Sequence, residues 1–440
     1  MSRNYDSRIS SATAFCKPHE FCAELIKNGD SPRSVIMGEG AVFTTSAAVL
    51  NCSSKETKTI AVGDEKCFAA DSQMTDESTI FNVASISKVF ASATLLRMIE
   101  SEKYREFFPR GVETPVEHFL SYLKLRYAGL DYVQTALQAE PHFSEMTLLN
   151  LLNHTSGLGN FDKDDFKKLR FESEESLKLE PDGKFFSIER AKPRPEFGKH
   201  SYSDCGYELL AMIVSSIASN QANRIVKYGE VVRDLVVEPL GLRHTFTPDQ
   251  MHEIDGKVVV ASREDLRVAQ AKDFNPELGQ LIPSRVFCRS IGGATALYST
   301  PSDVCEFFSN FCEGKLFSSE FFSPLYRVEC GKPNEYYGIG HFVYQEEGAP
   351  PKIFHGATTV GFFGHVRYDA LVQKAACVLN ATQNLSTKFL AEGENQALGS
   401  KRVSEECGYD ERLMLDRTTR VVEGAAAAAM IGAERRVGII

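Results

Sequence analysis

A serine and a lysine three positions apart, in the segment Ser85-Ile86-Ser87-Lys88, are the residues best suited to covalent chemistry. Residues at i and i+3 share one face of a helix, so the lysine amine can reach the serine hydroxyl. A serine at a helix N-terminus also lies among unpaired backbone N–H groups, which favour developing negative charge. Because a serine hydroxyl is a weak nucleophile without an adjacent base, this spacing indicates a nucleophile with its base. The alternative is an N-capping serine beside a surface lysine.

The pair lies where the apolar pattern changes from that of strands to that of a helix. Residues 34–52 and 57–65 are rich in β-branched and small apolar residues, which predicts two or three antiparallel strands. After Ser85 the apolar residues recur at helical spacing, namely Val89, Phe90, Ala93, Leu96 and Ile99. We therefore expect Ser85 at a strand-to-helix transition.

Strand patterns occur at both ends of the chain, and helical patterns lie between them. Helical spacing dominates from about 96 to 250, whereas 337–344, 352–369 and 374–383 resemble strands with glycine-rich bends. Such an arrangement predicts an α+β fold, an α/β sandwich in which one antiparallel sheet is built from both chain ends, flanked by helices, with an inserted mostly helical domain. The expected units are an N-terminal helical segment at 1–33, a sheet domain at 34–100 and 285–440, and the inserted domain at 101–284. Helical spacing also occurs at 9–27 and in the tail at 410–436.

Residues 162–192 form a highly charged stretch. We favour a solvated insertion on the surface. The alternative is a lid over the site, because the stretch leads directly toward Tyr202.

Composition limits the class of function. The chain has 440 residues, 43% of them hydrophobic, a formal net charge of -10 and no basic block, which argues against binding to nucleic acid or anionic lipid. No apolar run approaches the ~20 residues that span a bilayer, and the N-terminus lacks the apolar core of a signal peptide, so we expect a cytoplasmic protein without membrane association.

The 11 cysteines show no paired spacing, which favours free thiols over a disulfide framework. No motif predicts a metal or another cofactor.

Six segments, taken in chain order, resemble the serine β-lactamase and penicillin-binding protein superfamily, in particular its class C-like branch, which includes esterases and D-aminopeptidases. They cover roughly residues 35 to 390. The segments are TIFNVASISKVFASATLLRMIE (79–100), LLNHTSGLGN (151–160), HSYSDCGYELLAMIV (200–214), EPLGLRHTF (238–246), GGATALYSTPSDVCEFF (292–308) and HGATTVGFFGHVRYD (355–369).

This resemblance implies roles for individual residues. Ser85 would attack the acyl carbon of a small-molecule acyl substrate, and Lys88 would take or relay its proton. Tyr202 would be the second proton carrier. The backbone N–H groups of Ser85 and Thr358 would form the oxyanion hole, in which each donor typically contributes ~3 kcal/mol. His355 would occupy the place of the cation in the third catalytic segment. No cofactor is implied.

Two positions depart from the family pattern. Asp204 stands where the family has asparagine, and an ionised carboxylate only accepts hydrogen bonds and favours a charged Lys88. Ala357 stands where glycine is expected, beside the strand edge along which the substrate lies. Neutral His355 is also a weaker anchor for a substrate carboxylate than lysine. We therefore expect a site better suited to an ester, thioester or small amide than to a β-lactam.

Other functions stay open. The fold could persist as a catalytically weakened pseudoenzyme that binds or scaffolds, for which Asp204 and Ala357 are the support, or the acyl group could pass to a metabolite instead of water. Taken singly, Tyr202 fits a packing tyrosine and His355 a structural histidine. We assign His154 and Ser156 to a structural turn. Neither the substrate nor the oligomeric state is indicated.

Overall fold

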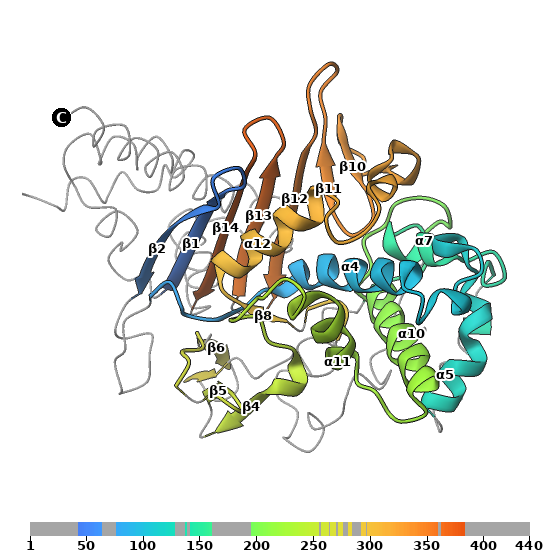
Figure 1. Ribbon diagram of the computed structural model, residues 1–440, viewed down its shortest axis with the longest axis horizontal. Coiled ribbons are helices and arrows are strands. Elements are labelled where there is room, and N and C mark those ends of the chain that lie inside the picture. The colour runs from blue at the N-terminus through green and yellow to red at the C-terminus, as the bar shows by residue number, and fades with distance from the viewer. Residues whose placement is uncertain are drawn as a thin grey trace, which may run out of the picture.

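An eight-stranded antiparallel sheet joins the first and last described strands of the computed structural model (Figure 1). Its order is β2-β1-β14-β13-β12-β11-β10-β9, so β1 pairs with β14 and the sheet is built from both ends of the chain, as predicted. The strands are β1 (Phe43–Asn51), β2 (Glu56–Gly63), β9 (Val328–Glu329), β10 (Glu335–Tyr337), β11 (Phe342–Tyr344), β12 (Lys352–Thr359), β13 (Phe362–Asp369) and β14 (Lys374–Thr382). The structure describes residues 43–63, 76–127, 137–138, 141–160, 195–254, 257–263, 265–269, 272–275, 280–283, 292–295, 297–359 and 362–382.

The main core lies on one face of this sheet. Side chains alternate between the two faces of a strand, and on β14 the alternate residues Ala375, Cys377 and Leu379 belong to the main core. Helix α12 (Pro301–Cys312) packs on β1, β13 and β14 and crosses the sheet in Figure 1. Its first turn is fixed by the Thr300 side chain, which accepts a hydrogen bond from the backbone of Asp303. The cysteines in the described ranges are thiols.

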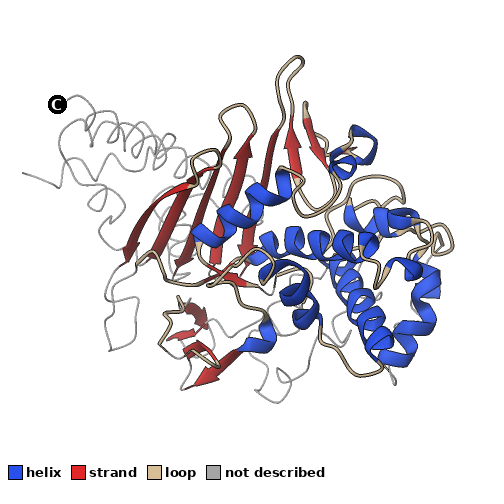
Figure 2. Ribbon diagram, in the orientation of Figure 1, coloured by secondary structure: helices blue, strands red, loops and turns tan. Residues whose placement is uncertain are grey.

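Helices form a second region beside the sheet (Figure 2). Helix α10 packs against α4, α5, α7 and α11 and is buried along most of its length. Both α4 and α10 are buried on most sides because each lies between other elements. The helices are α4 (Ser87–Glu100), α5 (Leu120–Arg126), α7 (Leu148–Leu152), α10 (Asp204–Ala222) and α11 (Tyr228–Val232).

Short strands interrupt the region that was expected to be mostly helical. Two hairpins form after α11, and in one of them the β-branched residues Val258 to Val260, of which Val258 and Val260 are buried and Val259 is half-buried, fit a strand better than a helix. The hairpin strands are β4 (Met251–Ile254) with β5 (Lys257–Val260), and β6 (Lys272–Asn275) with β7 (Gln280–Pro283). A further short pair, β3 (Phe81–Asn82) with β8 (Tyr298–Ser299), lies outside the region expected to be helical. The predicted segments 1–33, 162–192 and 410–436 lie outside the described residues, and the division into domains stays a prediction.

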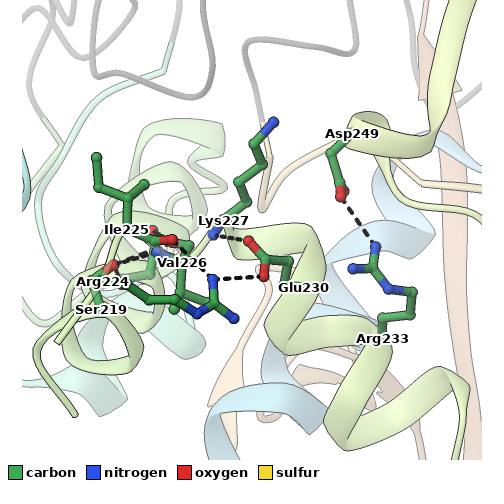
Figure 3. A network of polar contacts seen from close by, with 9 residues as sticks. Ser219, Arg224, Ile225, Val226, Lys227, Glu230, Arg233 and Asp249 are labelled. Atoms are coloured by element: carbon green, nitrogen blue, oxygen red, sulfur yellow. Dashed lines mark hydrogen bonds and ion pairs between the residues drawn. The ribbon is translucent and has the colours of Figure 1, made fainter. Parts of the chain in front are cut away.

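A polar network holds the turn between α10 and α11 (Figure 3). Glu230 accepts a hydrogen bond from the backbone of Lys227 at 2.8 Å and another from the Arg224 guanidinium at 3.0 Å. One turn later, Arg233 forms an ion pair with Asp249 at 3.1 Å. The Glu230 contacts hold the chain as it leaves α10, whose opposite end begins at the predicted site residue Asp204.

Three histidines of the sheet region are almost fully buried. His341, His355 and His365 expose 2%, 1% and 4% of their surface. Burial lowers the pKa of His355 to about 3 and those of His341 and His365 to about 4, from an ordinary 6.5. All three side chains are therefore neutral in the folded protein at physiological pH.

These neutral histidines make the folded state sensitive to mild acid. Below pH 6.5 the unfolded chain binds protons that the folded imidazoles cannot take up, so stability falls as the pH decreases toward about 4. Each imidazole is expected to contribute a slope of up to ~1.4 kcal/mol per pH unit. Urea denaturation between pH 7 and pH 5 measures this slope. His365→Gln should flatten it, whereas His252→Gln, at an exposed position, should not. An unchanged slope in His365→Gln would contradict the account.

The sheet and helical regions meet closely at Gly293. A Cβ atom at this position would lie 2.1 Å from the backbone oxygen of Tyr207 in α10. Gly293→Ala should therefore lower the free energy of unfolding by about 1–3 kcal/mol, measured by urea denaturation at pH 7. The control is Gly206→Ala, where the new Cβ would meet its nearest neighbour, the Leu151 oxygen, at an ordinary 3.7 Å. Equal stability of the two variants would refute the tight contact.

Candidate active site

A strained 3-10 turn, Ala84–Ile86, carries Ser85 directly before α4. Ala84 has a φ of 45°, in the left-handed region that non-glycine residues rarely adopt, at a cost of about 1–3 kcal/mol. Its backbone N–H donates to the Asn82 side chain at 2.7 Å, which holds the turn. Ala84 and Ile86 are buried, whereas Ser85 is partly exposed. The sequence therefore turns sharply out of β3 and presents the Ser85 hydroxyl at its surface.

Lys88 lies one helical turn along and is completely buried. Its Nζ atom lies 3.1 Å from Ser85 Oγ, 3.0 Å from the backbone oxygen of Ala294 and 2.5 Å from Asp204 Oδ1. An ammonium group has three hydrogens to donate, so three acceptors match it fully. The carboxylate contact favours the charged amine because a buried charge without a partner is costly.

The Ala294 contact is the one that sequence reasoning missed. The segment 292–308 was noted for its resemblance, but no role was given to its backbone. Gly293 lets this segment approach α10 closely, which brings the next carbonyl, that of Ala294, to Lys88. The paired glycines before Ala294 were the available signal for such an approach.

A hydrogen-bonded loop, residues 153–160, holds the segment that carries Tyr202 and Asp204. The Ser203 backbone N–H donates to His154 Nδ1 at 3.1 Å, and the Ser203 hydroxyl donates to the backbone of Gly159 at 2.7 Å. The same hydroxyl caps α10 by accepting from the backbone of Gly206. The backbone N–H of Asp204 donates to the Asn160 side chain at 3.2 Å. His154 thus acts on the backbone of its neighbours, as expected for a structural turn.

Tyr202 is partly exposed and lies against Lys88. The Lys88 ammonium is 4.9 Å from the centre of the tyrosine ring, within the range of a cation–π contact. The His154 ring packs beside Tyr202 at 4.3 Å between centroids. Burial, and then the charge of Lys88, holds the pKa of His154 well below its usual value, so a neutral ring separates Tyr202 from the core.

His355 lies behind the site rather than at its surface. Its Nδ1 atom is 2.6 Å from the backbone oxygen of Gly356, so this nitrogen carries the hydrogen. The other nitrogen, Nε2, then accepts from the Tyr337 hydroxyl at 3.3 Å. Both ring nitrogens are occupied within the protein, and the ring is neutral. The place taken by a cation in the family pattern therefore holds no charge.

Strand β12 lies beside the turn that carries Ser85. Its residues from 355 to 359 pair with β13 on one side, whereas β11 pairs only with 352–354, so in the described part of the chain the other edge has no partner strand. Ala357 is 2% exposed and its methyl group belongs to the main core. Thr358 contributes its backbone to β12, opposite Phe363.

The structure therefore brings together Ser85, Lys88, Tyr202 and Asp204. Three of them reach solvent and Lys88 does not. A serine hydroxyl and a carboxylate that contact one amine, with a tyrosine ring packed over that amine, can present a nucleophile and pass protons. Within the described ranges, no group of three or more histidine, cysteine or acidic side chains is arranged to hold a metal ion, and no helix is long and apolar enough to cross a membrane.

Comparison with known proteins gives the same fold. The structure is similar to the octameric penicillin-binding protein homologue from Pyrococcus abyssi, with a TM-score of 0.59 and 18% identity over 87% of this chain and 77% of the other. It is also similar to the D-stereospecific amidohydrolase from a Streptomyces species, with a TM-score of 0.55 and 18% identity over 82% and 95% of the two chains. A third similar structure is the D-amino acid amidase from Ochrobactrum anthropi complexed with D-phenylalanine, with a TM-score of 0.57 and 18% identity over 87% and 95%.

Sequence comparison identifies the family. The putative penicillin-binding protein PbpX of Bacillus subtilis (strain 168) is 22% identical over 277 residues, which are 62% of this chain and 57% of that protein's length. The model of the beta-lactamase family matches residues 61–376, from β2 to β14. Because this match spans well over half of the 440 residues, the chain belongs to the beta-lactamase family.

Proposed function

We propose that this protein is a serine hydrolase that forms a covalent acyl-enzyme on Ser85. The observation that supports this most strongly is the contact of 3.1 Å between Ser85 Oγ and Lys88 Nζ at the start of a buried helix. Membership in the beta-lactamase family and the similar amidohydrolase and amidase structures agree with a hydrolase.

The proton chemistry follows from the ion pair. Asp204 favours a charged Lys88, so in this proposal Lys88 stabilises negative charge near Ser85 and Tyr202 carries the proton. Ser85 Oγ bonds to the acyl carbon as its proton passes to the Tyr202 oxygen, which in this proposal starts as phenolate, and the carbonyl oxygen gains the negative charge. When the intermediate collapses, the bond to the leaving group breaks and that group takes the proton. Water then attacks the acyl-enzyme and releases the acid.

The oxyanion would be held by two backbone N–H groups. Ser85 supplies one at the start of α4, and Thr358 supplies the other from β12, which packs against the same turn. Removing one such donor typically costs about 3 kcal/mol of transition-state stabilisation.

The preferred substrate is an ester, a thioester or a small amide. Asp204 only accepts hydrogen bonds, so it cannot donate to the amide carbonyl beside the scissile bond, which asparagine can do. His355 is buried and neutral, so it offers no charge to a substrate carboxylate. Both features weaken the recognition of a β-lactam or a stem peptide.

The ion pair also supports a second candidate. A lysine held as ammonium is a poorer base, which fits a catalytically weakened protein that binds ligands through the same surface. Transfer of the acyl group to another molecule would use the same acyl-enzyme as hydrolysis.

Labelling with a fluorophosphonate probe separates an active nucleophile from an inactive one. Wild-type protein should react in a ratio of about one probe per chain because the probe traps the activated serine. Ser85→Ala should abolish labelling. The matched control is Ser87→Ala on the same helix, whose buried hydroxyl accepts a hydrogen bond from the Leu297 backbone and should be dispensable for labelling. No labelling of the wild type, or labelling that survives in Ser85→Ala, would favour the binding module.

Rates on two acyl donors test the substrate class. The value of kcat/KM for p-nitrophenyl butyrate should exceed that for nitrocefin by about tenfold or more, a difference of ~1.4 kcal/mol in the transition state. Asp204→Asn restores an amide donor and should raise acylation by nitrocefin. Faster turnover of nitrocefin than of the ester by the wild type would reject the proposed class.

A further inference from the structure

We propose that His154 is a positioning residue for Tyr202, the proton carrier of the proposed mechanism. It fixes the backbone on both sides of Tyr202 and packs against the tyrosine ring. This inference rests on the proposed function, because a fixed Tyr202 matters to catalysis only if Tyr202 receives the proton of Ser85. The turn that contains His154 then takes part in the reaction instead of serving the fold alone.

Two hydrogen bonds to His154 flank Tyr202 in the chain. The backbone oxygen of His154 accepts from the backbone N–H of Ser201 at 2.8 Å, and Nδ1 of its ring accepts from the backbone N–H of Ser203 at 3.1 Å. One residue therefore holds the positions directly before and directly after the tyrosine. Supporting contacts of this kind keep a functional side chain close to its working geometry.

The imidazole ring of His154 also packs against the side chain of Tyr202. The centroid of the imidazole lies 4.3 Å from that of Tyr202 and 4.6 Å from that of the fully buried Tyr337. The Lys88 ammonium lies 4.9 Å from the centre of the same Tyr202 ring. His154 is itself 1% exposed, so it is a packed neighbour of Tyr202 rather than a group that meets the substrate. Without the imidazole, the Tyr202 ring gains room to change its rotamer.

Histidine is a costly residue at this position. His154 has a φ of 61°, in the left-handed region that glycine and asparagine adopt with less strain. Burial holds the pKa of His154 well below its usual value, so the ring is neutral, and because Nδ1 accepts a hydrogen bond the ring hydrogen is on Nε2. This buried N–H has no acceptor in the described part of the chain. A residue that only formed the turn would avoid both costs, and such costs are typical of functional sites.

The loss of these contacts should slow the chemical step and leave binding almost unchanged. Proton transfer requires the Tyr202 oxygen within hydrogen-bond reach of Ser85 Oγ, and a displacement of about 1 Å costs on the order of a hundredfold in rate. Because His154 acts through Tyr202, the effect belongs in kcat rather than in KM.

Two variants that both suit a left-handed backbone test this role. His154→Gly removes the side chain, whereas His154→Asn keeps an acceptor, because the asparagine Oδ1 is as many bonds from Cα as the histidine Nδ1. With p-nitrophenyl butyrate, kcat of His154→Gly should fall by about tenfold to a hundredfold, at a KM within about threefold of the wild type. The kcat of His154→Asn should exceed that of the glycine variant by at least about fivefold.

His200→Asn is the matched control. It removes a second imidazole, 5.9 Å from that of His154, which among the described residues makes no hydrogen bond to Ser201 or Ser203. Its kcat should stay within about twofold of the wild type. Urea denaturation checks that each variant is folded, and if His154→Gly is not, His154→Gln, whose carbonyl lies one bond farther out, replaces it. Equal kcat in the two His154 variants would overturn the inference.

Fluorine NMR separates this inference from the proposed function. The protein is labelled with 3-fluorotyrosine, and the Tyr202 resonance is assigned by its absence in Tyr202→Phe. Because both His154 variants lack the imidazole ring current, a difference between them reports the lost acceptor. The resonance should be displaced or broadened in His154→Gly relative to His154→Asn, which supports the role of His154 at Tyr202 even if no ester is hydrolysed. Identical Tyr202 resonances in the two variants, or Ser85-dependent hydrolysis at the wild-type rate in both, would refute it.

Discussion

The buried ammonium group of Lys88 is the constraint on which the rest of the site depends. A charge with no exposure to water is stable only if each of its hydrogens has an acceptor. The three acceptors come from separate parts of the chain, namely the Ser85 turn, the N-terminus of α10 and the segment that contains Ala294. Removing any one of them leaves a buried donor unpaired. The need to satisfy Lys88 therefore ties the sheet region to the helical region at the place where chemistry is proposed.

Other local features of the fold follow from that junction. Gly293 has no side chain because its backbone lies against the Tyr207 oxygen, and any Cβ there would push the Ala294 carbonyl away from Lys88. Ala84 accepts a left-handed backbone because the sharp turn after β3 exposes Ser85 while its neighbours stay buried. The strain at Ala84 and the close packing at Gly293 thus both lie where three chain segments converge on one amine, and strain of this kind is common at functional sites.

The sequence predicted the parts of this arrangement that depend on local pattern. The strand-like composition at both chain ends predicted a sheet that joins them, and the pairing of β1 with β14 confirms it. The i, i+3 spacing predicted contact between Ser85 and Lys88, and the distance is 3.1 Å. The asparagine-to-aspartate departure predicted a carboxylate near Lys88, which the ion pair with Asp204 bears out.

The parts that were missed depend on backbone groups and on burial, which residue types do not reveal. A carbonyl oxygen such as that of Ala294 is present in every residue, so only the fold shows which one reaches the amine. His355 was expected in the place of a substrate-facing cation, but whether a histidine faces solvent depends on its neighbours across the sheet. Here Tyr337 and Gly356 occupy its nitrogens. The hairpins after α11 contain too few residues for their periodicity to outweigh the helical pattern around them.

The ion pair between Lys88 and Asp204 lies near two neutral histidines, His154 and His355. If His355 or His154 were charged, a second cation would lie near Lys88. Burial keeps both rings neutral, and Asp204 forms its ion pair with Lys88. A carboxylate at position 204 is therefore compatible with a buried lysine because neither of these two imidazoles brings a second positive charge. In the proposed mechanism the amine therefore stays in this ion pair, and the proton of Ser85 passes to the oxygen of Tyr202.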